Sequence, residues 1–178
     1  VLFGSEPFSS ALRMSNIKNY KYDWVWKKNK SGNVFLYKIS PMKRTENISV
    51  FLNGALIPQN EPNITFNHEA VKSDKLMKTT MKKEGIQNNG NRKDERYKKY
   101  YGNTGYKDNL LIYDVDKSRV HPTQKPILLM EYLIRTYTNE KETVLDFTMG
   151  SGSTMVAAQN LNRNGIGIEQ DEKYFKIA

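Results

Sequence analysis

The spacing of apolar residues in the first part of the chain predicts short strands and one helix. The apolar run at residues 1–4 indicates a strand, and the amphipathic pattern of residues 9–17 indicates a helix. Aromatic residues at every second position of residues 22–26 predict a second strand, and the apolar run at residues 48–52 predicts a third. Residues 27–32, which are charged, polar or glycine, are interpreted as a turn.

The middle of the chain, residues 53–119, is poor in apolar residues and rich in Asn, Lys, Gly and Tyr. Lysines and arginines interleave there with tyrosines, on both sides of an Asn/Gly-rich break at residues 88–91. This composition fits a solvated, partly disordered insertion. It fits equally well a DNA-contacting module, in which cations bind phosphates and tyrosines stack or donate hydrogen bonds. Composition alone leaves both interpretations open.

The last part, residues 120–178, begins with the pattern of an amphipathic helix. A proline in the first turn opens this helix, which is predicted over residues 126–137. Its apolar stripe consists of Ile127, Leu128, Met130, Leu133 and Ile134.

A strand, a helix and a second strand are predicted next. Residues 142–147 are typical of a strand buried in a parallel sheet. Residues 153–162 predict a helix with Ser153 or Thr154 near its N-cap, and residues 165–169 predict the following strand. A strand, a crossover helix and a parallel strand form a right-handed unit, so the sequence predicts an α/β fold.

Composition narrows the functional classes. A net charge of +9 and a pI near 9.5 favour a polyanionic partner such as nucleic acid. The absence of cysteine and the presence of only two histidines argue against a metal site. No apolar run approaches the ~20 residues of a membrane span, and no secretory signal is visible, so we expect a cytoplasmic protein. The first residue is Val1 and the last helical pattern has no stop signal, so we expect a fragment.

The candidate chemistry lies in the loop at residues 146–154, where the predicted strand meets the helix. Gly150 and Gly152 allow a tight turn and a close approach to a ligand, and the helix N-terminus favours an anionic group. Glu169, at the end of the next strand, can accept hydrogen bonds from two ribose hydroxyls. This arrangement predicts a nucleoside cofactor. Met155 occupies the third glycine position of the dinucleotide motif, which argues against NAD and FAD.

Three segments resemble a known family in the same order and spacing. Residues 144–154 resemble the S-adenosylmethionine-binding motif of DNA N6-adenine and N4-cytosine methyltransferases. Residues 121–126, His-Pro-Thr-Gln-Lys-Pro, are similar to the segment that precedes this motif in the permuted, beta-type members. Residues 165–169, with Tyr174 and Phe175 after them, resemble the next motif.

The resemblance implies a Rossmann-like α/β methyltransferase fold, with a mostly parallel sheet and a target-recognition insertion. Residues 1–52 would be the C-terminal part of the catalytic subdomain, residues 53–119 the target-recognition insertion, and residues 120–178 the S-adenosylmethionine-binding subdomain.

The activity implied is methyl transfer from S-adenosylmethionine to adenine N6 or cytosine N4 in double-stranded DNA. The source would be a bacterial or phage-borne restriction-modification system, with a restriction endonuclease as candidate partner and no metal. The implied cofactor-binding residues are Asp146, Phe147, Gly150, Gly152, Ser153, Glu169, Thr123 and Lys125. Alternatives remain: His121 as a turn or capping residue, Lys125 as a surface lysine, and Glu169 as an ordinary strand-end carboxylate.

One family motif is missing from the sequence. Members carry a tetrapeptide of Asp, Asn or Ser, then Pro-Pro, then Tyr or Phe, whose aromatic ring stacks on the flipped target base. Ser5-Glu6-Pro7-Phe8 fits three of the four positions, so Ser5, Pro7 and Phe8 are weak catalytic candidates. The favoured interpretation places this segment after a later strand and the true motif upstream of Val1. Thr45 also stands where relatives often carry a histidine.

Because that tetrapeptide is missing, we expect the isolated chain to bind the cofactor weakly and to be inactive. An inactive remnant, or a DNA-binding subunit that needs a partner chain, is the first alternative. A methyltransferase that acts on RNA, a small molecule or a protein is the second.

Overall fold

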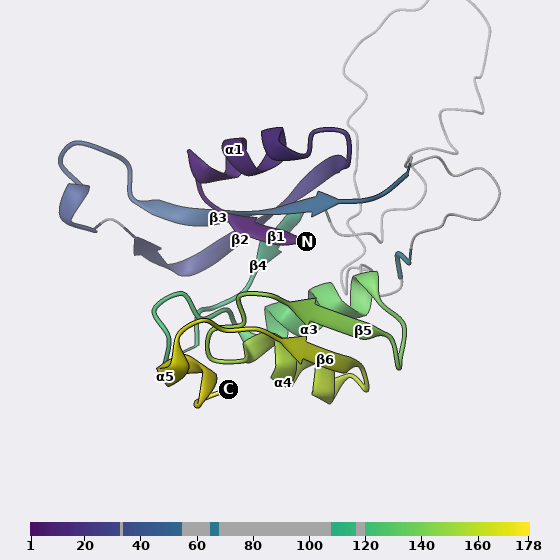
Figure 1. Ribbon diagram of the computed structural model, residues 1–178. Coiled ribbons are helices and arrows are strands. Elements are labelled where there is room, and N and C mark those ends of the chain that lie inside the picture. Colours follow the sequence, from purple (N-terminus) through teal and green to yellow (C-terminus); the bar gives the residue numbers. More distant parts are fainter. Residues whose placement is uncertain (33, 55–64, 68–107, 117–119) are drawn as a thin grey trace, which may run out of the picture.

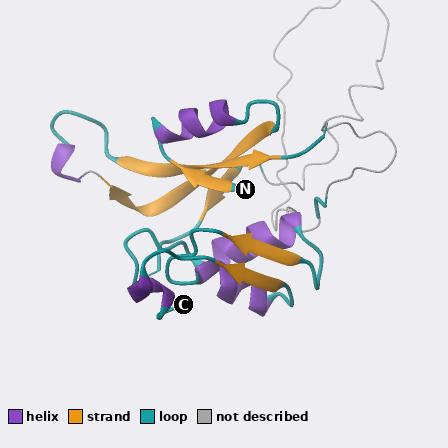
Figure 2. Cartoon of the chain, viewed as in Figure 1, coloured by secondary structure: helices purple, strands orange, loops and turns teal. Residues whose placement is uncertain are grey.

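The computed structural model describes residues 1–32, 34–54, 65–67, 108–116 and 120–178. Most of the predicted insertion, with its lysines and tyrosines, lies outside these residues. Two groups of strands form the described part, one beneath a helix and one against two helices (Figure 2). This arrangement confirms the predicted α/β class.

The first sheet has four strands, and α1 (Phe8–Ser15) lies over one face of it (Figure 1). In spatial order its strands are β1 (Leu2–Gly4), β3 (Lys43–Phe51), β2 (Tyr20–Gly32) and β4 (Leu110–Ile112). Strand β3 is antiparallel to both β1 and β2, whereas β2 and β4 are parallel. This sheet is therefore mixed rather than mostly parallel, because β2 and β3 follow each other as a hairpin.

The hairpin corrects one sequence interpretation. Strand β2 continues through residues 27–32, which were interpreted as a turn, and Gly32 is still paired with Lys43. Backbone pairing overrides the polar composition here, since the side chains of an edge segment can remain in water. The short helical turn η1 (Val34–Leu36) lies in the loop beyond it.

The second sheet contains β5 (Thr143–Asp146) and β6 (Asn164–Gly167), which are parallel and joined through α4 (Ser153–Asn160). The four-residue helix α5 (Glu172–Phe175) follows near the end of the chain. The predicted strand–helix–strand unit is confirmed. Its strands are not buried as predicted, because α3 and α4 cover only one face: Val144 packs inward, whereas Leu145 is 57% exposed.

Helix α3 (Ile127–Tyr137) connects the two sheets. Leu129, Tyr132 and Leu133 pack into the core of the first sheet, which contains Trp24 and Trp26. The cluster shared with β5 and α4 comprises Met130, Ile134, Ala157, Ala158 and Val144. The predicted apolar stripe is wrong at Leu128, which is exposed, because the helix turns its 129 and 132 positions toward the sheet instead. Because α3 buries side chains against both sheets, it fixes the second sheet relative to the first.

Candidate functional site

The loop between β5 and α4 has the backbone geometry that its glycines predict. Gly150 and Gly152 have φ angles of 55° and 79°, in the left-handed region that favours glycine. Gly152 is the N-cap of α4, so neither Ser153 nor Thr154 caps this helix; both are buried in its first turn. The loop thus turns sharply above the carboxyl end of β5.

Two acidic residues hold this loop in place. The Asp146 carboxylate accepts a hydrogen bond from the Thr148 amide at 3.0 Å and another from the Thr154 hydroxyl. The Glu169 carboxylate accepts the Gly150 amide at 2.8 Å through one oxygen and the Asp171 amide at 2.9 Å through the other. Asp146 is the last residue of β5, whereas Glu169 lies two residues beyond β6, which ends at Gly167 rather than at the predicted residue 169.

Hydrogen bonding keeps Glu169 ionised. The Asp171 amide lowers the pKa of Glu169 most; burial opposes this shift, and the amides of Gly150 and Gln170 add to it. Each carboxylate oxygen has a second lone pair after accepting one amide. Glu169 can therefore organise the glycine loop and still accept a hydrogen bond from a ligand hydroxyl.

The segment at residues 121–125 lies against this loop. The His121 ring is packed edge-on against Tyr174 with centroids 4.1 Å apart, and its Nδ1 accepts the Thr123 amide at 3.2 Å. A Cβ on Gly150 would lie 3.5 Å from the His121 ring. This geometry supports the interpretation of His121 as a turn residue that supports the glycine loop.

Lys125 has a partner that sequence reasoning missed. Its ammonium group lies 2.8 Å from one Glu46 oxygen, and Lys28 lies 2.6 Å from the other. Lys125 also lies 4.9 Å from the centre of the Phe3 ring. One feature of the sequence could have pointed to Glu46: it is the first acidic residue after Asp23 and follows a strongly cationic segment.

The predicted cofactor residues surround one cavity of about 650 Å³. Those that line it are Asp146, Phe147, Gly150, Ser153, Glu169, Thr123 and Lys125, whereas Gly152 does not. Leu2 and Phe3 of β1 form another part of the wall, as do Val144 and Leu145 of β5. Within the described residues β1 pairs only with β3 and β5 only with β6, so one edge of each strand is unpaired beside the cavity.

The weak catalytic candidates at residues 5–8 form the turn from β1 into α1. The Ser5 carbonyl accepts the Ser9 amide at 3.1 Å, and of the three candidates only Phe8 lines the cavity. Glu6 stands at the position of the missing proline.

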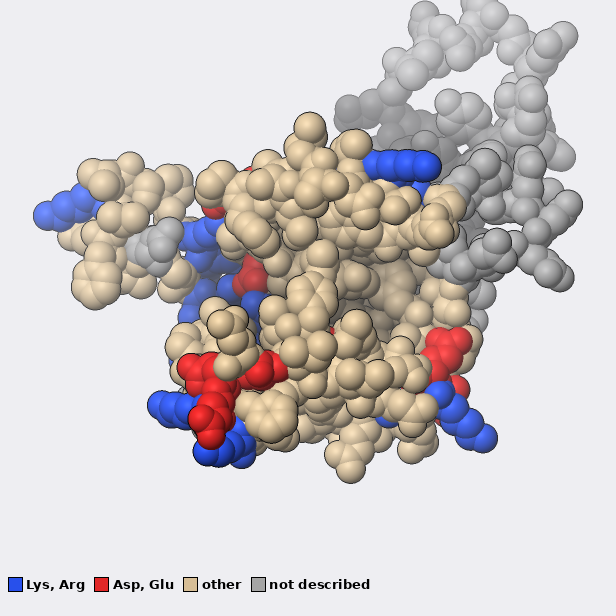
Figure 3. Space-filling view, in the orientation of Figure 1, with Lys and Arg blue, Asp and Glu red and all other residues tan. Residues whose placement is uncertain are grey.

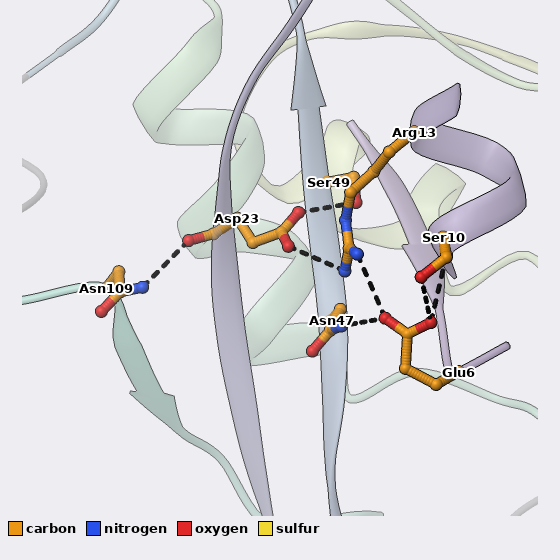
Figure 4. Close-up of polar contacts among 7 residues, drawn as sticks. All are labelled: Glu6, Ser10, Arg13, Asp23, Asn47, Ser49 and Asn109. Carbon is orange, nitrogen blue, oxygen red and sulfur yellow. Dashed lines mark hydrogen bonds and ion pairs between the residues drawn. The ribbon is translucent and has the colours of Figure 1, made fainter. Parts of the chain in front are cut away.

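The Glu6 carboxylate accepts hydrogen bonds from Ser10 and pairs with Arg13 at 3.1 Å (Figure 4). Arg13 also pairs with Asp23 at 2.9 Å, and Asp23 accepts the Ser49 hydroxyl at 2.6 Å. These contacts attach α1 to the sheet and give the segment a structural role; its catalytic role stays a prediction.

Two classes of feature are absent from the described residues. No group of three or more His, Cys, Asp or Glu residues in these ranges is arranged to hold a metal ion. Of the helices in the described ranges, none has the length and apolar character needed to cross a membrane.

Comparison with known proteins shows which family the chain is similar to. A family model described as DNA methylase matches residues 6–178. The type II methyltransferase M2.LlaDCHI of Lactococcus lactis subsp. cremoris is 47% identical over 58 residues, 33% of this chain and 22% of that protein. The type II methyltransferase M.BglI of Bacillus subtilis is 45% identical over 67 residues, 38% of this chain and 19% of that protein. The matches thus span about a fifth of these relatives.

Solved structures match almost the whole chain. The complex of M1.HpyAVI with SAM has a TM-score of 0.61 and 26% identity, and covers 99% of this chain and 70% of that chain. The cytosine-N4-specific PvuII DNA methyltransferase has a TM-score of 0.60 at 16% identity, and covers 94% of this chain and 53% of that chain. The second likeness concerns the fold alone.

Proposed function

This chain belongs to the DNA methylase family of N6-adenine and N4-cytosine enzymes, and we propose that it is part of a site-specific DNA methyltransferase. The complete enzyme transfers a methyl group from S-adenosylmethionine to adenine N6 or cytosine N4 in double-stranded DNA. The observation that carries the proposal is the cavity in which Asp146, Glu169 and the glycine loop meet.

The residues around the cavity suit this cofactor. A volume of about 650 Å³ is typical of a small-molecule site. Bound S-adenosylmethionine supplies a methyl group on a positively charged sulfonium, and Asp146, Glu169 and Glu46 place three carboxylates on the wall. Glu169 retains lone pairs for the ribose hydroxyls, and Gly150 lets the backbone approach without a Cβ. Thr123 and Lys125, from the segment that lies against the glycine loop, complete this part of the wall.

The catalytic tetrapeptide is absent from these 178 residues, and we propose that a polypeptide segment outside this sequence supplies it. The two unpaired strand edges beside the cavity, on β1 and β5, support this proposal. An added strand could pair with either edge and present its end to the cofactor. The isolated chain then binds the cofactor and DNA without turnover.

The biological setting is proposed on the same basis. The relatives are named type II methyltransferases, which suggests a restriction-modification setting. For the parent protein we propose a cytoplasmic modification enzyme with a restriction endonuclease as its partner. Digestion of the host's DNA by a co-encoded nuclease, blocked only when the parent enzyme is expressed, tests this setting.

Calorimetric titration with S-adenosylmethionine tests the cofactor site. Glu169→Gln removes the charge and leaves one acceptor oxygen for the two amides of Gly150 and Asp171, so we expect at least ~10-fold weaker binding. Glu172→Gln, three residues away on exposed α5, is the matched control and should bind like the original chain. Equal affinities of the two variants would contradict the assignment.

Methylation of plasmid DNA tests the second part of the proposal. The purified chain should transfer no labelled methyl group to DNA. Transfer by the chain alone, abolished by Glu169→Ala, would show that the catalytic groups lie within these residues.

A further inference from the structure

The far end of the β2–β3 hairpin is not explained by the cofactor site. It stands out from the rest of the molecule in Figure 3, with a cation at its tip and more where it joins the body. The hairpin end is defined here as residues 27–32 and 34–44. Its exposed apolar side chains are Val34, Phe35, Leu36, Tyr37, Ile39 and Met42.

These apolar side chains belong to neither hydrophobic core. Phe35 is 99% exposed and Ile39 is 81% exposed. Local backbone bonds nevertheless order the tip, since the amides of Ile39 and Ser40 both donate to the Leu36 carbonyl at 2.9 Å. An ordered group of exposed apolar side chains is typical of a surface that binds a partner.

The charges around the tip define the chemistry of that partner. The hairpin end carries Lys27, Lys28, Lys30, Lys38, Lys43 and Arg44, and no acid occurs between Asp23 and Glu46. Of these cations only Lys28 forms an ion pair with a described residue, Glu46. The other five have no carboxylate partner among the described residues; Arg44 donates to the Ser31 hydroxyl and Lys38 lies over the Tyr37 ring, so their positive charges remain uncompensated there.

The distribution of the cations favours duplex DNA over a membrane surface. They continue along β2 from the far end of the hairpin toward the body, where Lys28 pairs with Glu46, a residue of the cavity wall that also pairs with Lys125. The span from residue 27 to residue 32 is about 17 Å at ~3.3 Å per residue. Duplex DNA presents about one phosphate charge per ~1.7 Å, so one ligand can reach all of these cations.

We propose that the hairpin end is a duplex-DNA contact separate from residues 53–119. The Phe35 and Ile39 side chains are wedged against a base step, and the lysines bind the flanking phosphates. Apolar wedges of this kind unstack base steps and bend the duplex. The inference rests on the proposed function, because an enzyme that acts on a base must first take it out of the stack.

The cation part is tested by salt-dependent binding of the full chain to a short fluorescent duplex. Lys30→Gln/Lys38→Gln removes two phosphate contacts, so the slope of log affinity against log salt should fall by about 2. Lys18→Gln/Lys141→Gln changes the charge equally at exposed sites outside the hairpin and should leave the slope unchanged.

The wedge part is tested by Phe35→Ala and Ile39→Ala, with Ile17→Ala, an exposed site before the start of β2, as the matched control. Phe35→Ala should bind about 10-fold more weakly with an unchanged salt slope. Energy transfer between dyes on the duplex ends reports bending of the duplex. The original chain and Ile17→Ala should bend it equally, and Phe35→Ala and Ile39→Ala should bend it less. Thermal denaturation should show equal stability of all these variants.

Three results would overturn the inference. If hairpin and control variants bind DNA equally well, the hairpin is not a contact, and the proposed function stands. If the hairpin variants lose binding only to vesicles containing phosphatidylserine, the partner is a membrane. If the original chain binds neither DNA nor S-adenosylmethionine, the proposed function fails as well.

Discussion

Glu46→Gln should destabilise the chain by about 2 kcal/mol, because it breaks two ion pairs at a buried position. The Glu46 side chain is 11% exposed, and its two oxygens lie 2.8 Å from Lys125 and 2.6 Å from Lys28. Glutamine keeps the size but loses the charge, so two ammonium groups remain close together without a carboxylate. The repulsion between the two lysines weakens the contact of β2 and β3 with the segment before α3.

The magnitude follows from the degree of burial. Removal of one partner from a fully buried pair costs about 3–5 kcal/mol. The lysine side chains are 21% and 27% exposed, so both can turn toward water and recover part of their hydration. About 2 kcal/mol therefore remains, which corresponds to a fall in Tm of roughly 4–8 °C for a chain of this length.

Thermal denaturation at pH 7, followed by circular dichroism, measures this difference. Glu172→Gln is the matched control, because its pair with Lys176 has side chains that are 80% and 70% exposed. Exposed pairs contribute under ~1 kcal/mol. If Glu46→Gln lowers Tm no more than Glu172→Gln, the two lysines do not stabilise Glu46 and the reasoning is refuted.

The pH dependence gives an independent check. Burial raises the pKa of Glu46, but Lys125 and Lys28 together lower it more, so its folded-state pKa lies below the ordinary 4.5. The ionised carboxylate therefore stabilises the fold at pH values above 4.5, and this contribution is lost as the pH falls through the folded-state pKa. The difference in Tm between the original chain and Glu46→Gln should be constant near neutrality and shrink below pH 4.5.

Two further predictions concern stability. Gly152→Ala should cost about 1–2 kcal/mol, because φ is 79° and the new Cβ would lie 2.9 Å from the Ala178 Cβ. Gly32→Ala is the control in urea denaturation, because its Cβ would lie in ordinary contact, 3.7 Å from the Lys43 carbonyl oxygen. Tyr137→Phe should cost about 1–3 kcal/mol, because the buried Trp24 indole loses its hydrogen-bond acceptor. Tyr37→Phe, at a 62% exposed site, is the control and should leave the free energy of unfolding unchanged.

Local patterns in the sequence were sufficient to predict most elements. The sequence patterns predicted α3, β5, α4 and β6 to within two residues at each end, although Leu128 departs from the apolar stripe of α3. They failed in the second half of β2, where the strand is held by pairing with β3 rather than by its own composition. The charged and polar residues 27–32 resemble a turn in composition, and the pairing with β3 that makes them a strand is not visible in the local sequence.

The close packing of α4 on β6 shows a different limit. Met155 replaces the third glycine of the dinucleotide motif, which argues against NAD and FAD. The helix still packs closely, because the small residues lie on the strand: a Cβ on Gly165 would lie 2.9 Å from the Met155 sulfur. Close packing of the helix on the strand can thus come from a small residue on either α4 or β6, and the motif considers only the helix.

The candidate site was predictable where its residues are close in sequence and unpredictable where they are not. Asp146, Gly150 and Glu169 belong to one strand–helix–strand unit, so their spacing along the chain determines their meeting. Glu46 and Lys125 are brought together by α3, which packs against both sheets. No local pattern encodes that contact.

The net charge of +9 conceals two regions of opposite character. The cavity carries Asp146, Glu169 and Glu46, which suits a positively charged sulfonium, whereas the hairpin end carries only cations. Glu46 lies where the two regions meet, and its pairs with Lys28 and Lys125 neutralise charge that would otherwise repel either ligand. The proposed function places a cationic cofactor beside a polyanion, and a buried Glu46 paired with two lysines is compatible with both ligands.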